Sequence, residues 1–300
     1  MNSIDVIKKH SQNAESIITI GTFDGVHKGH ELVFKFLRDT SNLIPIVITF
    51  NKSPREVINN NPNKSIYEAK TKESFIRDLG VKKVISLNFD ESIKSLSAKE
   101  FIELLKKYLN LKTLVIGEDT TIGKDKIGKI NGLDDVLLSF GCELKLIKIK
   151  KSNEQKISSS QIKKEILSGK FENANKNLTN KYFLEGIVVE GKKLGRELGY
   201  PTANLNFSDE IIIPMDGIYK TATIHEGNKF DSITSIGNNP TFNEKLKTIE
   251  TYIINFDNNI YNQKLKIFFI NFIRKQIKFD NEGDLINQMN KDLKEVMKDN

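Results

Sequence analysis

The chain has 300 residues, of which 38% are hydrophobic and 28% charged, which is typical of a globular protein of two domains. Its 46 basic and 39 acidic side chains give a formal net charge of +7 at pH 7, but no dense basic run is interleaved with aromatic residues. This positive charge favours anionic small molecules as partners. Because no such basic run is present, we expect that the protein does not bind nucleic acid.

The cysteine count and the lengths of the apolar runs exclude two further classes of protein, those built on disulfides or cysteine–zinc sites and those that span a membrane. Cys142 is the single cysteine, which excludes an intramolecular disulfide and a cysteine-based zinc site, and its apolar neighbourhood predicts burial. The N-terminus has no apolar stretch of signal-peptide length, and nowhere do 18 apolar residues follow one another. We expect a cytoplasmic protein without a membrane as a partner.

Up to about residue 150, short apolar runs alternate with amphipathic segments. Ser97 begins one helical pattern, and Glu100 three residues later predicts a capping box. The candidate strands span 17–20, 44–50, 81–87, 111–117 and 142–149, and the helical patterns lie at about 29–38, 67–79, 97–109 and 129–140. This alternation predicts an α/β domain with a parallel sheet covered on both faces, in which ligands bind beyond the carboxyl ends of the strands.

The second half has a different period. After the polar stretch 150–160, two short helical patterns lead to about residue 180. Period-two runs follow at 182–191, 217–224, 230–237, 248–257 and 264–272. Strands without intervening helices predict an antiparallel sandwich or barrel. A helical stripe that packs on it is formed by Leu285, Met289, Leu293 and Val296.

Two of the four histidines, His27 and His30, lie three residues apart where a helix is predicted to begin. Zinc usually requires three or four ligands, and no companion cluster of His or Cys is present. A histidine that merely caps the helix would explain either residue singly. The unpaired N–H groups of a helix start, two imidazoles and three nearby glycines together favour a phosphate site.

These residues resemble a family signature. GTFDGVHKGH, residues 21–30, is similar to the G-x-F-D-G-x-H-x-G-H motif of bacterial FAD synthetases, which belong to the Rossmann-like nucleotidyltransferases. The resemblance implies that His27 and His30 are catalytic and stabilise the α-phosphate of ATP as pyrophosphate leaves. It also implies ATP binding by Gly21, Phe23, Asp24 and Gly29.

Further segments extend the resemblance through the first half. LSAKEFIELL (96–105), VIGED (115–119) and ISSSQIKKEIL (157–167) are similar to family segments. The resemblance implies that Asp119 lies near the nucleotide and that a serine-rich helix start holds phosphates. The residues concerned in this helix are Ser158, Ser159, Ser160 and Lys163. Lys163 stands where the family has an arginine, so that the charge is kept without bidentate geometry.

A second phosphate site is predicted in EGKKLGRELGYPTANLNF, residues 190–207. Its glycines are interleaved with Lys192, Lys193 and Arg196, and such a loop either wraps a polyphosphate or is an ordinary basic surface loop. Pro201 biases the chain towards an extended conformation, in which Thr202 and Asn204 point to the same side. These two neutral oxygen ligands suit Mg²⁺ between phosphates.

Glu250 lies in TIETYIINF, residues 248–256, where period two places it on one face with Tyr252. The opposite face carries Ile249 and Ile253, so the pattern leaves two interpretations open. Glu250 is either a surface residue at a strand end or a buried base.

GKKLGRELGYPTANL is similar to the G-x-x-x-G-x-x-L-G-x-P-T-A-N signature of riboflavin kinases, and four later segments follow that family in order: 216–219, 235–242, 249–257 and 272–279. The resemblance implies an antiparallel β-barrel with a terminal helix. Thr202 and Asn204 would bind Mg²⁺ and ATP phosphate, and Glu250 would be the base for the riboflavin 5′-hydroxyl. Flavin binding is implied for Arg274 and Leu285, and ATP binding for Gly191, Lys192, Gly195, Gly199 and Pro201.

Together the resemblances predict an FMN adenylyltransferase domain over 1–180 and a riboflavin kinase domain over 181–300. Riboflavin, FMN, FAD and ATP are the expected partners, with Mg²⁺ as cofactor and ATP as co-substrate, and a homo-oligomer stays open. Departures from the family at Ser53, Thr120 and Lys163 motivate one alternative, a kinase with an inactive or weakly active first domain. The positive net charge motivates another, a flavin-responsive regulator that binds nucleic acid.

Overall fold

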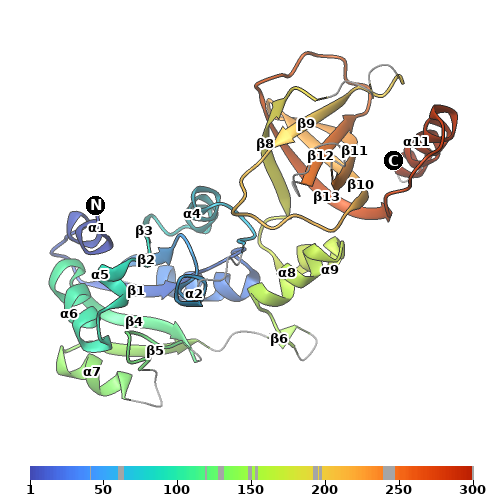
Figure 1. Cartoon of the computed structure of the whole chain (residues 1–300). Helices are drawn as coiled ribbons and strands as arrows, with labels where there is room; N and C mark the ends of the chain where they lie inside the picture. The colour runs from blue at the N-terminus through green and yellow to red at the C-terminus, as the bar shows by residue number, and fades with distance from the viewer. Residues whose placement is uncertain are drawn as a thin grey trace. The chain divides into compact units, whose positions relative to one another are not determined.

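The computed structural model describes residues 1–40, 42–59, 64–118, 120–127, 132–147, 151–152, 155–191, 195, 198–238 and 247–298. The contacts within the chain divide it into two compact units, Met1–Ser159 and Ser160–Asn300 (Figure 1). The expected domain boundary after residue 180 stays a prediction.

Unit 1 contains a five-stranded parallel sheet with the strand order β3-β2-β1-β4-β5. All five strands expected from the apolar runs are present. They are β1 (Ser16–Gly21), β2 (Ile44–Phe50), β3 (Lys83–Leu87), β4 (Leu111–Gly117) and β5 (Glu143–Ile147). The order reverses between β1 and β4, and in open parallel sheets this switch point is where ligands bind. The carboxyl end of β1 therefore opens into the place where a nucleotide site is expected.

Helices cover both faces of this sheet, as the sequence predicts. Alternate strand residues face opposite ways: Ile18 and Ile48 pack with α1, α6 and α7, whereas Ile17 and Val47 pack with α2 and α4. The helices of unit 1 are α1 (Ser3–Lys9), α2 (Lys28–Asp39), α3 (Pro54–Asn59), α4 (Ala69–Asp78), α5 (Glu91–Lys94), α6 (Ala98–Leu109) and α7 (Leu133–Ser139). Cys142 is buried and free. Among these helices α1, α3 and α5 were not predicted, because four to seven residues are too few to show a period.

The structure confirms the capping box that the sequence predicts at the start of α6. The Ser97 hydroxyl accepts the backbone N–H of Glu100 at 3.3 Å, and the Glu100 carboxylate accepts the N–H of Ser97 at 2.7 Å. Two of the unpaired N–H groups at the helix start are thereby satisfied.

Unit 2 is a closed antiparallel barrel, which decides between the sandwich and the barrel in favour of the barrel. The strand order is β10-β11-β12-β9-β8-β13. Its strands are β8 (Phe183–Val189), β9 (Thr202–Asn206), β10 (Gly217–His225), β11 (Asn228–Asn238), β12 (Lys247–Ile253) and β13 (Lys264–Arg274). Four short elements lie ahead of the barrel in the chain: β6 (Lys151–Ser152) and β7 (Gln155–Lys156) belong to unit 1, and α8 (Ser159–Leu167), which begins at the last residue of unit 1, and α9 (Phe171–Asn177) follow.

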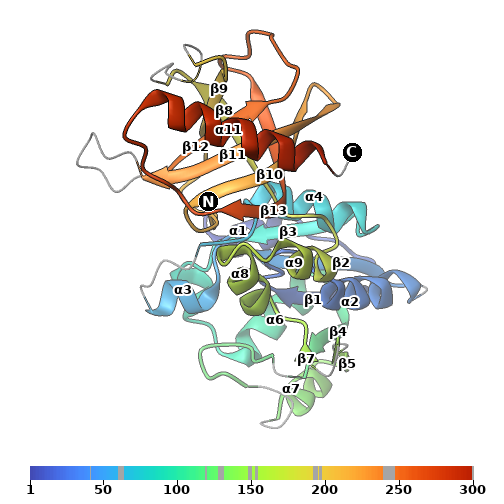
Figure 2. The same ribbon diagram turned by 90° about the vertical axis from the view of Figure 1, so that its right-hand side faces the viewer.

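The barrel interior is filled by side chains. Thr221, Ser232 and Thr234 are fully buried, and their hydroxyls are linked at 2.8 Å and 2.9 Å. A barrel of this size has no room left for a ligand inside, so a substrate must bind on its outer surface. There the terminal helix α11 (Glu282–Met297) packs against β11, as Figure 2 shows. Within the described residues, no helix is long and apolar enough to cross a membrane.

Candidate active sites

The turn between β1 and α2 is strained. Phe23 and Val26 have positive φ angles of 49° and 42°, and Gly25 between them has 78°. A branched residue such as Val26 rarely adopts this left-handed conformation, and each such residue costs about 1–3 kcal/mol. Both side chains are buried, which lets the surrounding core hold the turn in this form. Strain of this kind clusters at functional sites, and this turn carries the motif of the first predicted site.

His27 and His30 cap the helix start reciprocally. The Nδ1 atom of His27 accepts the backbone N–H of Gly29 at 3.2 Å, and Nδ1 of His30 accepts the N–H of His27 at 3.3 Å. The two rings stack with centroids 3.6 Å apart. Since Nδ1 is an acceptor in both rings, the proton of each neutral imidazole resides on Nε2. The helix start therefore presents two parallel Nε2–H donors.

Both imidazoles are neutral at physiological pH. Burial lowers the pKa of His27 to about 4, and burial lowers the pKa of His30 well below its usual value. The neighbouring His27 ring and the charge of Lys72 lower the pKa of His30 further. The paired histidines thus act as hydrogen-bond donors rather than as charges, and they suit a phosphate whose oxygens gain charge during a reaction.

A segment far along the chain reaches the same turn. Ser159, the first residue of α8, donates its hydroxyl to the carbonyl of Asp24 at 2.8 Å. The Asp24 carboxylate is buried and accepts the N–H of Ile66 at 2.9 Å. The structure therefore brings Asp24, His27, His30 and Ser159 together.

The other predicted residues of this site are placed unevenly. Gly21 ends β1, and Phe23 lies edge-on to the His30 ring with centroids 5.1 Å apart. Gly29 and Ser160 lie in the first turns of α2 and α8, respectively, and Ser158 precedes α8. Lys163 is half-buried further along α8. Asp119 lies outside the described residues.

Sequence reasoning missed Lys72 of α4, whose side chain is only 4% exposed. Its ammonium donates to the main-chain carbonyls of Thr22 at 3.0 Å and Phe50 at 2.6 Å. A signal was present, because Lys72 lies four residues before Ile76 and seven before Leu79, on the apolar stripe of its helix.

The second site is a cavity of about 280 Å³ between the barrel surface and α11. In the pairing of β9 with β12, Asn204 lies opposite Glu250 and Thr202 opposite Tyr252. Residues opposite each other share a face, so these polar groups lie together. Ile249 and Ile253 face the other way and are buried. This decides the orientation left open by the sequence: Glu250 faces the cavity.

Two glycines bring backbone against the predicted magnesium ligands. A Cβ atom on Gly191 would lie 2.0 Å from the amide nitrogen of Asn204. A Cβ atom on Gly195 would lie 2.4 Å from the carbonyl oxygen of Tyr200 and 3.3 Å from the hydroxyl of Thr202. No larger residue fits without displacing these groups.

The rest of the predicted loop is described in part. Gly199 adopts φ +83°, which favours glycine, and Pro201 is exposed just before β9. Lys192 lies outside the described residues, as do Lys193 and Arg196.

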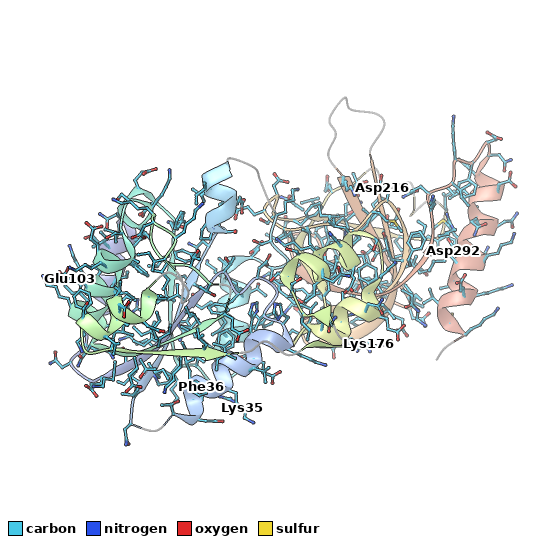
Figure 3. All side chains as sticks on the ribbon, turned by 90° about the horizontal axis from the view of Figure 1, so that it is seen from below. Lys35, Phe36, Glu103, Lys176, Asp216 and Asp292 are labelled. Carbon is cyan, nitrogen blue, oxygen red and sulfur yellow. The ribbon has the colours of Figure 1, made fainter. Side chains whose placement is uncertain are left out.

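Arg274 lines the cavity, but its guanidinium is held by the terminal helix. Its Nε and Nη2 atoms donate to the Asp292 carboxylate at 2.9 Å and 2.6 Å, and Gln288 donates to the same carboxylate at 2.9 Å. Figure 3 shows Asp292 on the side of α11 that faces the barrel. Leu285 and Met289 line the cavity from the same helix. The ion pair therefore fixes the apolar wall of the cavity.

Unit 1 should lose stability as the pH falls from 6.5 towards 4. The folded chain holds the pKa of His27 near 4 while the unfolded chain takes up this proton near 6.5, so acidification favours the unfolded chain. The slope should be about 1.4 kcal/mol per pH unit for each histidine so affected. Urea unfolding at pH 7 and pH 5, followed on NMR signals of unit 1, measures it. His27→Gln keeps an acceptor that does not titrate and should give a shallower slope, whereas equal slopes would contradict the assignment.

Asp292→Asn should loosen α11. The substitution removes the carboxylate that pairs with the guanidinium of Arg274, and this guanidinium is mostly shielded from water. The free energy of unfolding should fall by about 3 kcal/mol. Thermal unfolding and amide hydrogen exchange of α11 measure the loss. Glu295→Gln, an exposed carboxylate on the same helix, is the matched control and should change neither. Unchanged exchange in Asp292→Asn would show that the ion pair does not hold the helix.

Both halves of the chain match known family models. Residues 9–161 match a family described as FAD synthetase, and residues 178–299 match one described as riboflavin kinase. The two matches follow one another in the chain and correspond to the halves that carry the two sites.

Whole proteins of the same organisation are similar over nearly their full length. Bifunctional riboflavin kinase/FMN adenylyltransferases are 33% identical in Buchnera aphidicola subsp. Schizaphis graminum, over 95% of this chain and 94% of that protein, and 33% identical in Bacillus subtilis, over 99% and 98%. A crystal structure from Streptococcus pneumoniae, described as a macrolide-efflux protein, has a TM-score of 0.86 at 30% identity and covers 97% of each chain. On these matches, the chain belongs to the family of bifunctional riboflavin kinase/FMN adenylyltransferases.

Proposed function

We propose that the chain converts riboflavin to FAD in two steps that each consume ATP. Unit 2 phosphorylates riboflavin to FMN, and unit 1 adenylylates FMN with release of pyrophosphate. One observation carries this proposal: each unit has its own candidate phosphate site, and the two sites differ in chemistry. In unit 1 two neutral imidazoles lie at a helix start, which suits attack at the α-phosphorus of ATP, and in unit 2 a carboxylate lies opposite Asn204, which suits attack by a hydroxyl at the γ-phosphorus. The paired histidines and Ser159 are together in unit 1, which favours two activities over a kinase alone. Both family matches are to enzymes, which disfavours a nucleic-acid-binding regulator.

In the kinase reaction, Glu250 is the base. Its carboxylate takes the proton of the riboflavin 5′-hydroxyl as that oxygen attacks the γ-phosphorus of ATP and ADP leaves. The flavin ring lies against the apolar wall that Leu285, Met289 and Tyr252 provide in the cavity. Arg274 shapes this end through its bond to Asp292.

Thr202 and Asn204 would hold Mg²⁺ in unit 2. The donor set fits, because a hydroxyl and an amide oxygen lie on one strand face, each with a glycine packed against it. Among the described residues, no group of three or more His, Cys, Asp or Glu side chains could hold a metal. The remaining ligands must then come from phosphate oxygens and water. When bound, Mg²⁺ supplies positive charge that neutralises the transferring phosphate.

In the adenylyltransferase reaction, the FMN phosphate attacks the α-phosphorus of ATP. His27 and His30 donate from Nε2 to the α-phosphate oxygens, whose charge grows in the transition state. The N-terminal end of α2 and the serine-rich start of α8 hold further phosphate oxygens. The nucleophile is already an anion, so this step requires positioning and hydrogen bonds rather than a base.

Purified protein incubated with riboflavin, ATP and Mg²⁺ tests the whole proposal. Chromatographic separation of the flavins should show FMN first and FAD afterwards, with pyrophosphate formed in step with FAD. Riboflavin that is recovered unaltered would contradict the kinase, and FMN that accumulates without FAD would restrict the chain to the kinase alone.

Glu250→Gln should lower the rate of FMN formation by at least about a hundredfold, the scale of a lost general base. Binding of ATP should change little, since the amide keeps the shape of the side chain. Steady-state rates of FMN formation and a nucleotide-binding titration measure the two effects. Glu185→Gln, on β8 outside the cavity, is the control. Turnover at the wild-type rate would mean that another group is the base.

His30→Ala should lower FAD formation from FMN by about a hundredfold, the scale of one lost donor to a developing charge. FMN formation from riboflavin should stay at its wild-type rate, because His30 belongs to unit 1. Both rates can be measured on one preparation. His10→Ala, in the same unit but outside the β1–α2 turn, is the matched control. An equal loss of both activities would refute the division into two sites.

A further inference from the structure

Lys72 is a buried charge that neither reaction accounts for. Its ammonium binds the carbonyls of Thr22, which follows β1, and Phe50, which ends β2. The Thr49 hydroxyl donates to the Thr22 carbonyl as well, at 3.0 Å. These bonds fasten the carboxyl ends of two neighbouring strands at the point where the chain turns towards His27.

The position would suit an apolar residue. Lys72 lies on the buried stripe of α4, and burying an ammonium is costly unless it is hydrogen-bonded and compensated. Compensation comes from Asp24 in the same turn, which raises the pKa of Lys72 against the larger lowering by burial. The resulting pKa of about 8 leaves Lys72 charged at pH 7. A retained buried charge next to a strained turn indicates a role beyond packing.

We propose that Lys72 is a positioning residue for adenylyl transfer: it anchors the β1–α2 turn and places a positive charge near the paired histidines at neutral pH. This inference rests on the proposed function of unit 1. An oxygen of the FMN phosphate forms the bond to the α-phosphorus while the bond to the bridging oxygen breaks, and pyrophosphate leaves with the electron pair. Lys72 gives up no proton in this step. Its charge adds to the effect of burial in opposing protonation of His30, so that this ring stays a neutral Nε2–H donor, and it offsets the negative charge of the two substrates.

Lys72→Met tests the proposal, because it keeps the length of the side chain and removes both the charge and the donors. We expect the kcat of FAD formation from FMN and ATP to fall at least about tenfold, with each KM changed less than about threefold. FMN formation in unit 2 of the same chain should be unaffected. Lys70→Met, exposed on the same helix, is the control and should leave both reactions unchanged.

The outcomes separate this inference from the proposed function. If the wild-type protein forms no FAD from FMN, the function of unit 1 is wrong. If the wild-type protein forms FAD and Lys72→Met does so at the same kcat, the function stands and the inference is overturned. Parallel losses in the adenylyltransferase and kinase rates would also overturn it.

A pH profile decides the matter even if Lys72→Met fails to fold. Within the part of the chain that the structure describes, the charged and titratable groups that interact with Lys72 are Asp24 in the turn and His30 on α2. The wild-type kcat of FAD formation should fall as the pH rises through about 8, where Lys72 loses its proton. Lys72→Arg stays charged and should keep its rate to higher pH. Identical alkaline limbs in the two proteins would overturn the proposal.

Discussion

The first site depends on one pair of hydrogen bonds, those that bring backbone N–H groups to Nδ1 of His27 and His30. They satisfy two donors at the start of α2 and, at the same time, leave Nε2–H of each ring to face a ligand. Burial keeps both rings neutral, which removes the repulsion that two stacked imidazolium ions would suffer. On the proposed mechanism, the strained turn ahead of α2 serves to present both rings to one phosphate.

In unit 2, close approach of the backbone positions the groups that we propose to face a phosphate. There, Gly191 and Gly195 approach Asn204 and Thr202 so closely that a side chain at either glycine would displace them. The oxygen ligands that we propose are neutral, and the carboxylate of Glu250 lies opposite Asn204. Because the barrel interior is filled, we expect the flavin to bind on the outer surface, where α11 supplies the second wall of the cavity.

Local features could be predicted from the sequence, and features that depend on two distant elements could not. Period two and period 3.6 predicted the five parallel strands and an antiparallel sandwich or barrel, of which the structure shows the barrel, and the Ser97–Glu100 spacing predicted a cap that the structure confirms. The ion pair of Arg274 and Asp292 joins a strand to a helix, which no periodic pattern reports. The stripe of α11 that faces the cavity and the barrel runs through Asp292 rather than Leu293, at spacings of four, three and four residues from Leu285 to Val296. In both helices a charged residue on the apolar stripe indicates a buried interaction with another element: Asp292 on α11 and Lys72 on α4.

The two sites differ in chemistry for a reason that lies in their substrates. A hydroxyl is a weak nucleophile until its proton is removed, so the kinase reaction requires a base, and Glu250, which faces the cavity, is the carboxylate that we propose for it. A phosphate monoester attacks as an anion, so a base in unit 1 would add only repulsion. Asp24 is the carboxylate in that turn, and its Oδ1 atom accepts the N–H of Ile66 while Lys72 lies nearby as a compensating charge. On the proposed mechanism, one chain cleaves ATP at two different phosphorus atoms because a carboxylate faces the cavity in unit 2, whereas the carboxylate of the β1–α2 turn is bound within the scaffold of unit 1.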